Sequence, residues 1–182
     1  MTHELLGLKV KIEECKENFE TVYQKEYFPQ ELLDEIKVAN VLLIPNHINR
    51  NGKEEYIFPE TTLEFFEFVK DNIVDGMKPD IAVDDEGFKK LELHSATITV
   101  ATFVVTSVLF PIMVNLVSSY LYDQVKKMHR NKEDVSAKVN IISTDENGKK
   151  SKMISYEGPV SGIKEALENA SKEIFKDDNQ GN

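Results

Sequence analysis

ATITVATFVVTSVLFPIMVNLVSSYLY, residues 96–122, is the stretch that decides how the chain folds. No Asp, Glu, Lys or Arg occurs between Leu93 and Tyr122. A helix of about 20 apolar residues is long enough to cross the hydrocarbon core of a bilayer. The stretch therefore predicts one long apolar helix over residues 93–130 and a lipid membrane as its surroundings.

Small polar side chains follow this predicted helix in two stripes, which are typical of closely packed membrane helices. The first stripe has residues four, three and four positions apart, and the second lies roughly opposite on a helical wheel. The candidate helix-packing interface consists of Ser95, Thr99, Thr102 and Thr106 on one side and Asn115 and Ser118 on the other. Two interpretations stay open: self-association into a homo-oligomer, or a single anchor whose hydroxyls bond its own backbone.

Proline and basic residues give the predicted helix a shape and an orientation. Pro111 stands between the two stripes, and proline removes a helical hydrogen bond, so a kink is expected there. Basic side chains flank the C-terminal end at Lys126, Lys127, Arg130 and Lys132. The number of lysine and arginine residues on each side of the predicted membrane helix places its C-terminal side in the cytoplasm. A re-entrant or peripheral helix would keep both ends inside.

The first half of the stretch also supports a different interpretation. Eight of the eleven residues from Ala96 to Thr106 are Val, Ile or Thr, a composition that favours a strand. A strand ending at Thr106 and a helix from about Ser107 to Met128 would then be buried in a core or a subunit interface. The protein would in that case be a soluble, cytoplasmic α+β homo-oligomer of unknown role.

Residues 1–92 predict an acidic α/β domain. Apolar residues spaced three or four apart favour helix over residues 4–37, broken at Pro29. Residues 38–45 (VANVLLIP) and 80–83 (DIAV) favour strands. A helix capped by Thr61 or Thr62 is expected between them.

Residues 131–176 predict a ββα unit, so the fold class as a whole is α+β. The pair Asn147-Gly148 separates two strand-like runs, which is a strong hairpin signal. An amphipathic helix is expected from Ile163 to Phe175. Residues 177–182 are expected to form a disordered tail.

Composition and motifs point away from several functions. The formal net charge is -10, which disfavours nucleic acid as a partner. Cys15 is the only cysteine, as expected in a reducing compartment. The four histidines are scattered, and neither metal-ligand spacing nor a catalytic motif is present. We therefore expect no cofactor, no metal and no enzymatic activity.

Four segments resemble parts of uncharacterised bacterial single-span proteins: VANVLLIP (38–45), FPETTLEFF (58–66), VNLVSSYLYD (114–123) and ISYEGPVSGIKEAL (154–167). The part from the apolar stretch to the ββα unit is similar to small effector-associated membrane components of bacterial conflict and phage-defence systems. This resemblance covers less than half of the chain and its motifs are architectural, so it implies no active-site residues.

The resemblance implies a membrane-associated interaction or accessory protein of the bacterial cell membrane, binding protein partners without catalysis. An enzyme of unknown type and a pore former that inserts on a trigger are further hypotheses.

Overall fold

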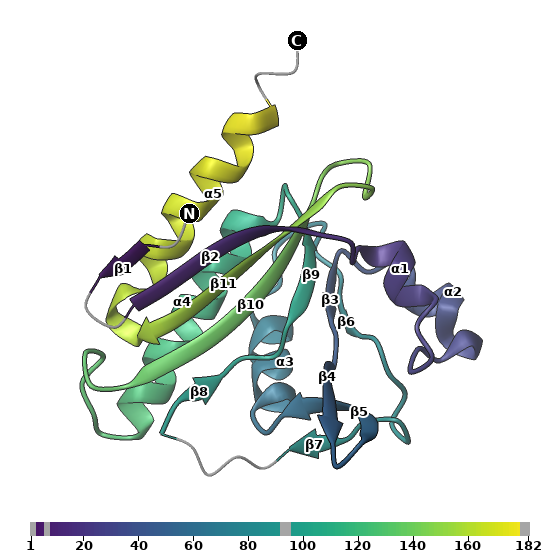
Figure 1. The fold of residues 1–182 in the computed structure, drawn as a ribbon, viewed down its shortest axis with the longest axis horizontal. Helices are drawn as coiled ribbons and strands as arrows, with labels where there is room; N and C mark the ends of the chain where they lie inside the picture. The colour runs from purple at the N-terminus through teal and green to yellow at the C-terminus, as the bar shows by residue number, and fades with distance from the viewer. Residues whose placement is uncertain (1–2, 6–7, 92–95, 179–182) are drawn as a thin grey trace.

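The computed structural model describes residues 3–5, 8–91 and 96–178, which form a mixed α+β fold (Figure 1). This confirms the α+β class predicted from the sequence. None of the helices in these residues combines the length and the apolar character that a membrane crossing requires.

Eight strands of the described residues form the main sheet, in the order β1-β2-β11-β10-β9-β3-β6, with β8 beside β10. Their bounds are β1 His3–Leu5, β2 Leu8–Cys15, β3 Val41–Leu43, β6 Pro79–Ile81, β8 Ile98–Thr99, β9 Phe103–Thr106, β10 Ser136–Thr144 and β11 Ser151–Pro159. β9 runs parallel to β10 and antiparallel to β3, and β3 runs parallel to β6. The sheet thus joins strands from the predicted N-terminal domain (1–92) with strands from the predicted ββα unit (131–176).

The apolar stretch does not form one helix, so the prediction of a long helix over residues 93–130 is wrong. Its first half forms β8 and β9, and its second half forms α4, Phe110–Lys127. The β-branched residues of β9 extend between β3 and β10, where they are buried on both faces of the sheet. The alternative of a strand ending at Thr106 followed by a helix describes this arrangement.

Pro111 lies in the first turn of α4, and Leu109 is the N-cap, so the predicted kink within a long helix is also wrong. A proline in the first turn leaves no helical hydrogen bond broken, because that N–H has no partner in the helix. Pro111 therefore marks where the helix begins.

Helices cover the two faces of the sheet unequally. α3 (Thr62–Asp71), α4 and α5 (Ile163–Asp178) pack on one face, here called the three-helix face (Figure 1). A separate apolar cluster lies on the opposite face, where α1 (Phe19–Tyr23), the 3-10 turn Gln30–Leu32 and α2 (Leu33–Ile36) contact the sheet. We call this second face the α1–α2 face; its sheet residues include Leu42, Val104 and Ile142.

The N-terminal segment differs from the helix predicted over residues 4–37. β1 and β2 are strands, and β2 pairs antiparallel with β11 from Cys15 opposite Ser151 to Lys9 opposite Glu157. Leu8, Val10 and Ile12 alternate along β2 and pack against the three-helix core. Helix begins only after Asn18, whose side chain accepts a hydrogen bond of 2.9 Å from the Thr21 backbone N–H.

The predicted hairpin and the helix after it are confirmed. β10 and β11 pair along their full lengths, and Gly148 in the turn has a φ of 67°. The Asp145 carboxylate accepts hydrogen bonds from the backbone N–H groups of Lys149 and Lys150, at 2.9 and 3.3 Å. After the 3-10 turn Val160–Gly162, α5 extends to Asp178, so residues 177 and 178, expected in the disordered tail, are helical. Residues 179–182 lie outside the described residues.

A smaller sheet projects beside the main one and positions the candidate site. The chain leaves β3 at Pro45 and forms β4 (Asn46–Arg50) and β5 (Lys53–Pro59), with β7 (Lys90–Leu91) next to β5. Asn51 and Gly52 both have positive φ, 54° and 80°, as a tight two-residue hairpin requires. The hairpin of β4 and β5 belongs to this separate sheet, and its residues His47 and Tyr56 line one pocket together with Ile142 and Met153 of the main sheet.

Candidate functional site

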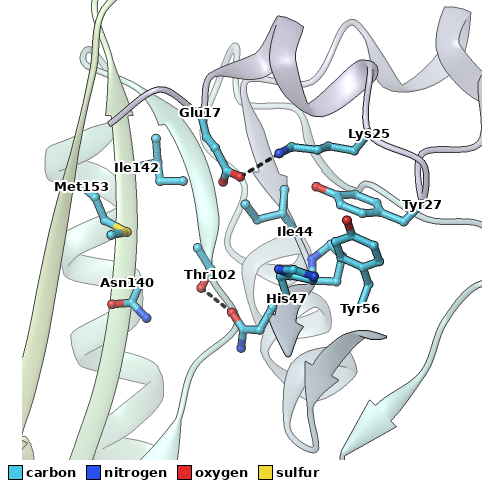
Figure 2. A pocket seen from close by; sticks show the side chains of 12 residues that line it. Glu17, Lys25, Tyr27, Ile44, His47, Tyr56, Thr102, Asn140, Ile142 and Met153 are labelled. Carbon is cyan, nitrogen blue, oxygen red and sulfur yellow. Dashed lines mark hydrogen bonds and ion pairs between the residues drawn. The ribbon is translucent and has the colours of Figure 1, made fainter. Parts of the chain in front are cut away.

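A cavity of about 270 Å³ lies on the α1–α2 face, between the main sheet and the β4–β5 hairpin (Figure 2). Its lining comes from four separate parts of the chain: the α1 region, the β3–β5 segment, the approach to β9, and the β10–β11 hairpin. We call it the hairpin pocket.

The floor of the hairpin pocket is built by strand alternation. Asn140 and Ile142 are two residues apart on β10, so both point to the α1–α2 face. Met153 is the register partner of Ile142 on β11 and lies on the same side. Ile44 continues from β3, where its backbone N–H donates to the carbonyl of Thr102 at 2.9 Å. The floor is thus mostly apolar, with one amide at its edge.

Three aromatic rings form the wall opposite the floor. His47 on β4 and Tyr56 on β5 are register partners, and their rings stack with centroids 5.0 Å apart and planes 28° apart. The ring of Tyr27, from the loop after α1, lies 4.8 Å from that of Tyr56 at 57°. The imidazole of His47 also pairs with the carboxylate of Glu54. These contacts hold the rings in place before any ligand enters.

Burial keeps the hydroxyl of Tyr27 protonated. Desolvation raises the pKa of Tyr27 well above its ordinary value, and the nearby Glu17 carboxylate and the Tyr56 hydroxyl raise it further. The group is therefore a neutral hydrogen-bond donor and acceptor at all ordinary pH values.

The charged groups of the pocket neutralise each other. The ammonium of Lys25 lies 3.2 Å from the carboxylate of Glu17, with the two side chains 37% and 39% exposed. At the other end, the Thr102 hydroxyl donates to Oδ1 of Asn46 at 3.0 Å. The pocket is polar at both ends without a strong net charge.

Several polar groups in the pocket have no protein partner. Among the described residues, no hydrogen bond is formed by the Asn140 amide, the Nδ2 of Asn46, or the hydroxyls of Tyr27 and Tyr56. Such groups are available to a ligand or to water. The arrangement can therefore bind and orient a small molecule through several donors and acceptors.

Within the described residues, no group of three His, Cys, Asp or Glu side chains is placed to hold a metal ion. The pocket lining contains neither a serine nor a cysteine as a nucleophile.

The predicted helix-packing residues are distributed over the fold and do not share one helix face. Ser95 lies outside the described residues. Thr99 is in β8, and its carbonyl accepts a hydrogen bond from the Thr61 hydroxyl at 3.0 Å. Thr102 lines the hairpin pocket, and Thr106 ends β9.

The remaining two residues of that set are on α4 but face differently. Asn115 is exposed, whereas Ser118 is buried and donates to the carbonyl of Val114, four residues earlier, at 2.8 Å. Ser118 thus bonds its own helix, as in the second of the two interpretations drawn from the sequence.

The basic residues predicted to flank a membrane are exposed at the end of α4 and in the loop after it. Lys126 and Lys127 occupy its last turn, where cations complement the helix dipole. Lys127 lies 3.3 Å from the Glu64 carboxylate on α3. Arg130 and Lys132 follow, and the Lys132 ammonium lies 4.5 Å from the centre of the Tyr122 ring.

Sequence reasoning did not identify the residues of the hairpin pocket, apart from Thr102, which it assigned to helix packing. Tyr27, Tyr56 and Asn140 carry no local motif, and His47 was one of four scattered histidines. The useful signal would have been Pro45, which ends the buried run VANVLLIP and directs the polar segment NHINR away from the sheet.

No protein-family model, curated protein or solved structure matches the chain.

Proposed function

We propose that this protein is a non-enzymatic binding protein that holds a small molecule in the hairpin pocket. The observation that carries the proposal is the set of unpaired polar groups beside a pre-formed aromatic wall. Binding sites for small molecules are typically concave, partly apolar and largely pre-formed, with a few polar groups that orient the ligand.

The proposal treats the apolar stretch as the core of the fold. Phe103 and Val105 on β9 and Met113 and Val117 on α4 have no exposed surface, because they pack between the sheet and the three helices. Residues in such a core stabilise the fold and are not free to contact lipid. Membrane association and a role in bacterial defence remain predictions from the sequence.

Ligand-observed NMR with a library of small polar aromatic fragments tests the proposal. We expect some fragments to bind the unchanged protein and to lose binding in the variants Tyr56→Ala and Asn140→Ala. Ser155→Ala is the matched control, because Ser155 is the register partner of Asn140 on β11 and lies outside the pocket. A library without any binder sensitive to Tyr56→Ala or Asn140→Ala would contradict the proposal.

A contact with protein partners is the second candidate function, supported by a group of exposed valines. Val38, Val74 and Val108 are 56%, 39% and 69% exposed. Hydrogen bonds of Asn40 bring the three valines near one another. Val38 is two residues before Asn40, and Val74 is two residues before Gly76, whose carbonyl accepts from the Asn40 side chain. Val108 is two residues after Thr106, whose N–H donates to the Asn40 carbonyl. We call these three residues the valine patch. Exposed apolar groups that gather at one place are typical of interaction sites.

Sedimentation velocity shows whether the valine patch contacts a second copy of the chain or is exposed to solvent. If the valine patch joins two copies of the chain, Val108→Lys should lower the apparent mass at a fixed concentration. Lys172→Ala, on the exposed side of α5, is a control that should leave the mass unchanged. Equal masses for unchanged protein and Val108→Lys would rule out a homo-oligomer through this patch.

A further inference from the structure

We propose that the ligand of the hairpin pocket is an uncharged, planar nitrogen heterocycle of the nucleobase type, free or as its nucleoside. This inference rests on the proposed function, since it names the ligand class of the same pocket. Four features carry it: the aromatic wall, the free polar groups of two carboxamides, the balanced charge and the cavity volume.

The aromatic wall favours a flat ring. The ring of Tyr56 contacts the rings of His47 and Tyr27, at centroid distances of 5.0 and 4.8 Å. Figure 2 shows these rings on one side of the cavity and the strand residues Ile142 and Met153 on the other. A planar ligand can lie between them with one face on an aromatic side chain and the other on apolar atoms. Bases bind proteins in this way, because every base has an apolar π face.

The carboxamides favour a ligand edge with a donor next to an acceptor. The Asn140 amide offers one acceptor and two donor hydrogens, and none of them bonds to a described protein group. The Thr102 hydroxyl occupies Oδ1 of Asn46 and so leaves Nδ2 of Asn46 as a donor. A carboxamide pairs in two-point fashion with the adjacent donor and acceptor of a base such as adenine.

The charge distribution excludes a strongly anionic ligand. Lys25 is the only lysine or arginine that lines the pocket in the described residues, and its partner Glu17 neutralises it. The whole chain carries a formal charge of -10, which repels phosphate. We therefore expect a free base or nucleoside to bind at least as tightly as the matching nucleotide, and single-stranded nucleic acid not to bind.

The cavity volume favours a ligand with one ring system. About 270 Å³ is slightly less than the range of about 300–1,000 Å³ that is usual for drug-sized ligands. The volume therefore favours a single base over a dinucleotide cofactor.

The experiment is a calorimetric titration of the full chain with adenine, cytosine, uracil, adenosine and adenosine monophosphate, with phenylalanine as an aromatic compound that is not a base. We expect at least one base or nucleoside to bind. Asn140→Ala and Tyr56→Ala should each weaken that binding about tenfold or more. Ser155→Ala should leave it unchanged, and circular dichroism shows whether each variant is folded.

Four outcomes would overturn the ligand class. In the first, no base or nucleoside binds at millimolar concentration. In the second, binding is unaffected by Asn140→Ala and Tyr56→Ala. In the third, adenosine monophosphate binds more than about tenfold more tightly than adenosine, which contradicts the charge argument. In the fourth, phenylalanine binds as tightly as the best base. The fragment library separates failure of the ligand class from failure of the proposed function. If no base binds but other fragments bind the pocket, only the ligand class is refuted. If no fragment binds the pocket, the proposed function is refuted as well.

Discussion

The side chain of Asn40 donates a hydrogen bond to the carbonyl of Gly76 over 2.7 Å, and its Oδ1 accepts one from the Lys78 backbone N–H, also over 2.7 Å. Asn40 directly precedes β3, and its side chain thus hydrogen-bonds two backbone groups of the loop that precedes β6. Gly76 has a φ of 81°, a conformation that a residue with a Cβ adopts only with strain. The parallel pairing of β3 and β6 begins at this point.

Replacing Asn40 with Ala should lower the free energy of unfolding by about 0.5–1.5 kcal/mol, because the N–H of Lys78 and the carbonyl of Gly76 exchange their partner for water. Urea unfolding followed by circular dichroism measures the change. Asn115→Ala is the control, since Asn115 is exposed within α4. That variant should be at least as stable as the unchanged protein, because alanine favours helix. Equal stability of the two variants would show that the Asn40 contacts contribute little.

Phe103 and Val108 test how the apolar stretch is used. Phe103 has no exposed surface on β9, so Phe103→Ala should cost about 3–5 kcal/mol of unfolding free energy through lost contacts and a cavity. Val108 is 69% exposed, and Val108→Ala should change stability by about 0.5 kcal/mol or less. Both values come from urea unfolding. Similar losses of unfolding free energy in Phe103→Ala and Val108→Ala would contradict a buried strand followed by an exposed turn.

Ser118→Ala tests the predicted self-association through small polar residues. The hydroxyl of Ser118 donates to the carbonyl of Val114 within α4, and within the described residues it forms no other hydrogen bond. We expect stability to change by no more than about 1 kcal/mol and the sedimentation coefficient to stay the same. A shift towards a smaller species would instead indicate that Ser118 holds two copies together.

Alkaline pH should destabilise the protein partly through Tyr156. Burial raises the pKa of this tyrosine from 10.0 to about 12, and its hydroxyl donates to the carbonyl of Pro159. The unfolded chain therefore loses the Tyr156 proton at a lower pH than the folded one. The stability that this group contributes is complete below about pH 10 and is lost as the pH rises to about 12.

The measurement compares urea midpoints of the unchanged protein and Tyr156→Phe at several values in this pH range. Tyr156→Phe lacks the ionisable hydroxyl, so its midpoint should fall less steeply than that of the unchanged protein. Parallel curves would mean that Tyr156 ionises alike in the folded and unfolded chains. Tyr120, whose pKa burial also raises to about 12, contributes equally to both curves.

The parts of the fold that the sequence predicted are those with a local cause. Asn147-Gly148 carries its own turn preference, and Thr62 begins a helix with a regular apolar stripe. β2 lacked such a cause. Leu8, Ile12 and Cys15 have helical spacing, while Leu8, Val10 and Ile12 alternate as in a strand. Pairing with β11, far along the chain, decides between the two patterns.

The apolar stretch was ambiguous for a similar reason. Its lack of charge is equally suitable for lipid and for the centre of a sheet covered on both faces. Only the presence of β3 and β10 on either side of β9 makes the sheet the better place for residues 103–106. The hairpin pocket could not be predicted, because Tyr27, Tyr56 and Asn140 approach each other only after the whole fold has formed.

The pairing of β2 with β11 has a consequence for the order of synthesis. Cys15 and its partner Ser151 are 136 positions apart in the sequence, so β2 leaves the ribosome long before the strand that completes its hydrogen bonds. Until then its apolar residues Leu8, Val10 and Ile12 are without their native cover. Such long-range pairing is slow and leaves strands open to aggregation. The pairing of β2 with β11 is therefore among the last contacts of the main sheet that can form while the chain is being made.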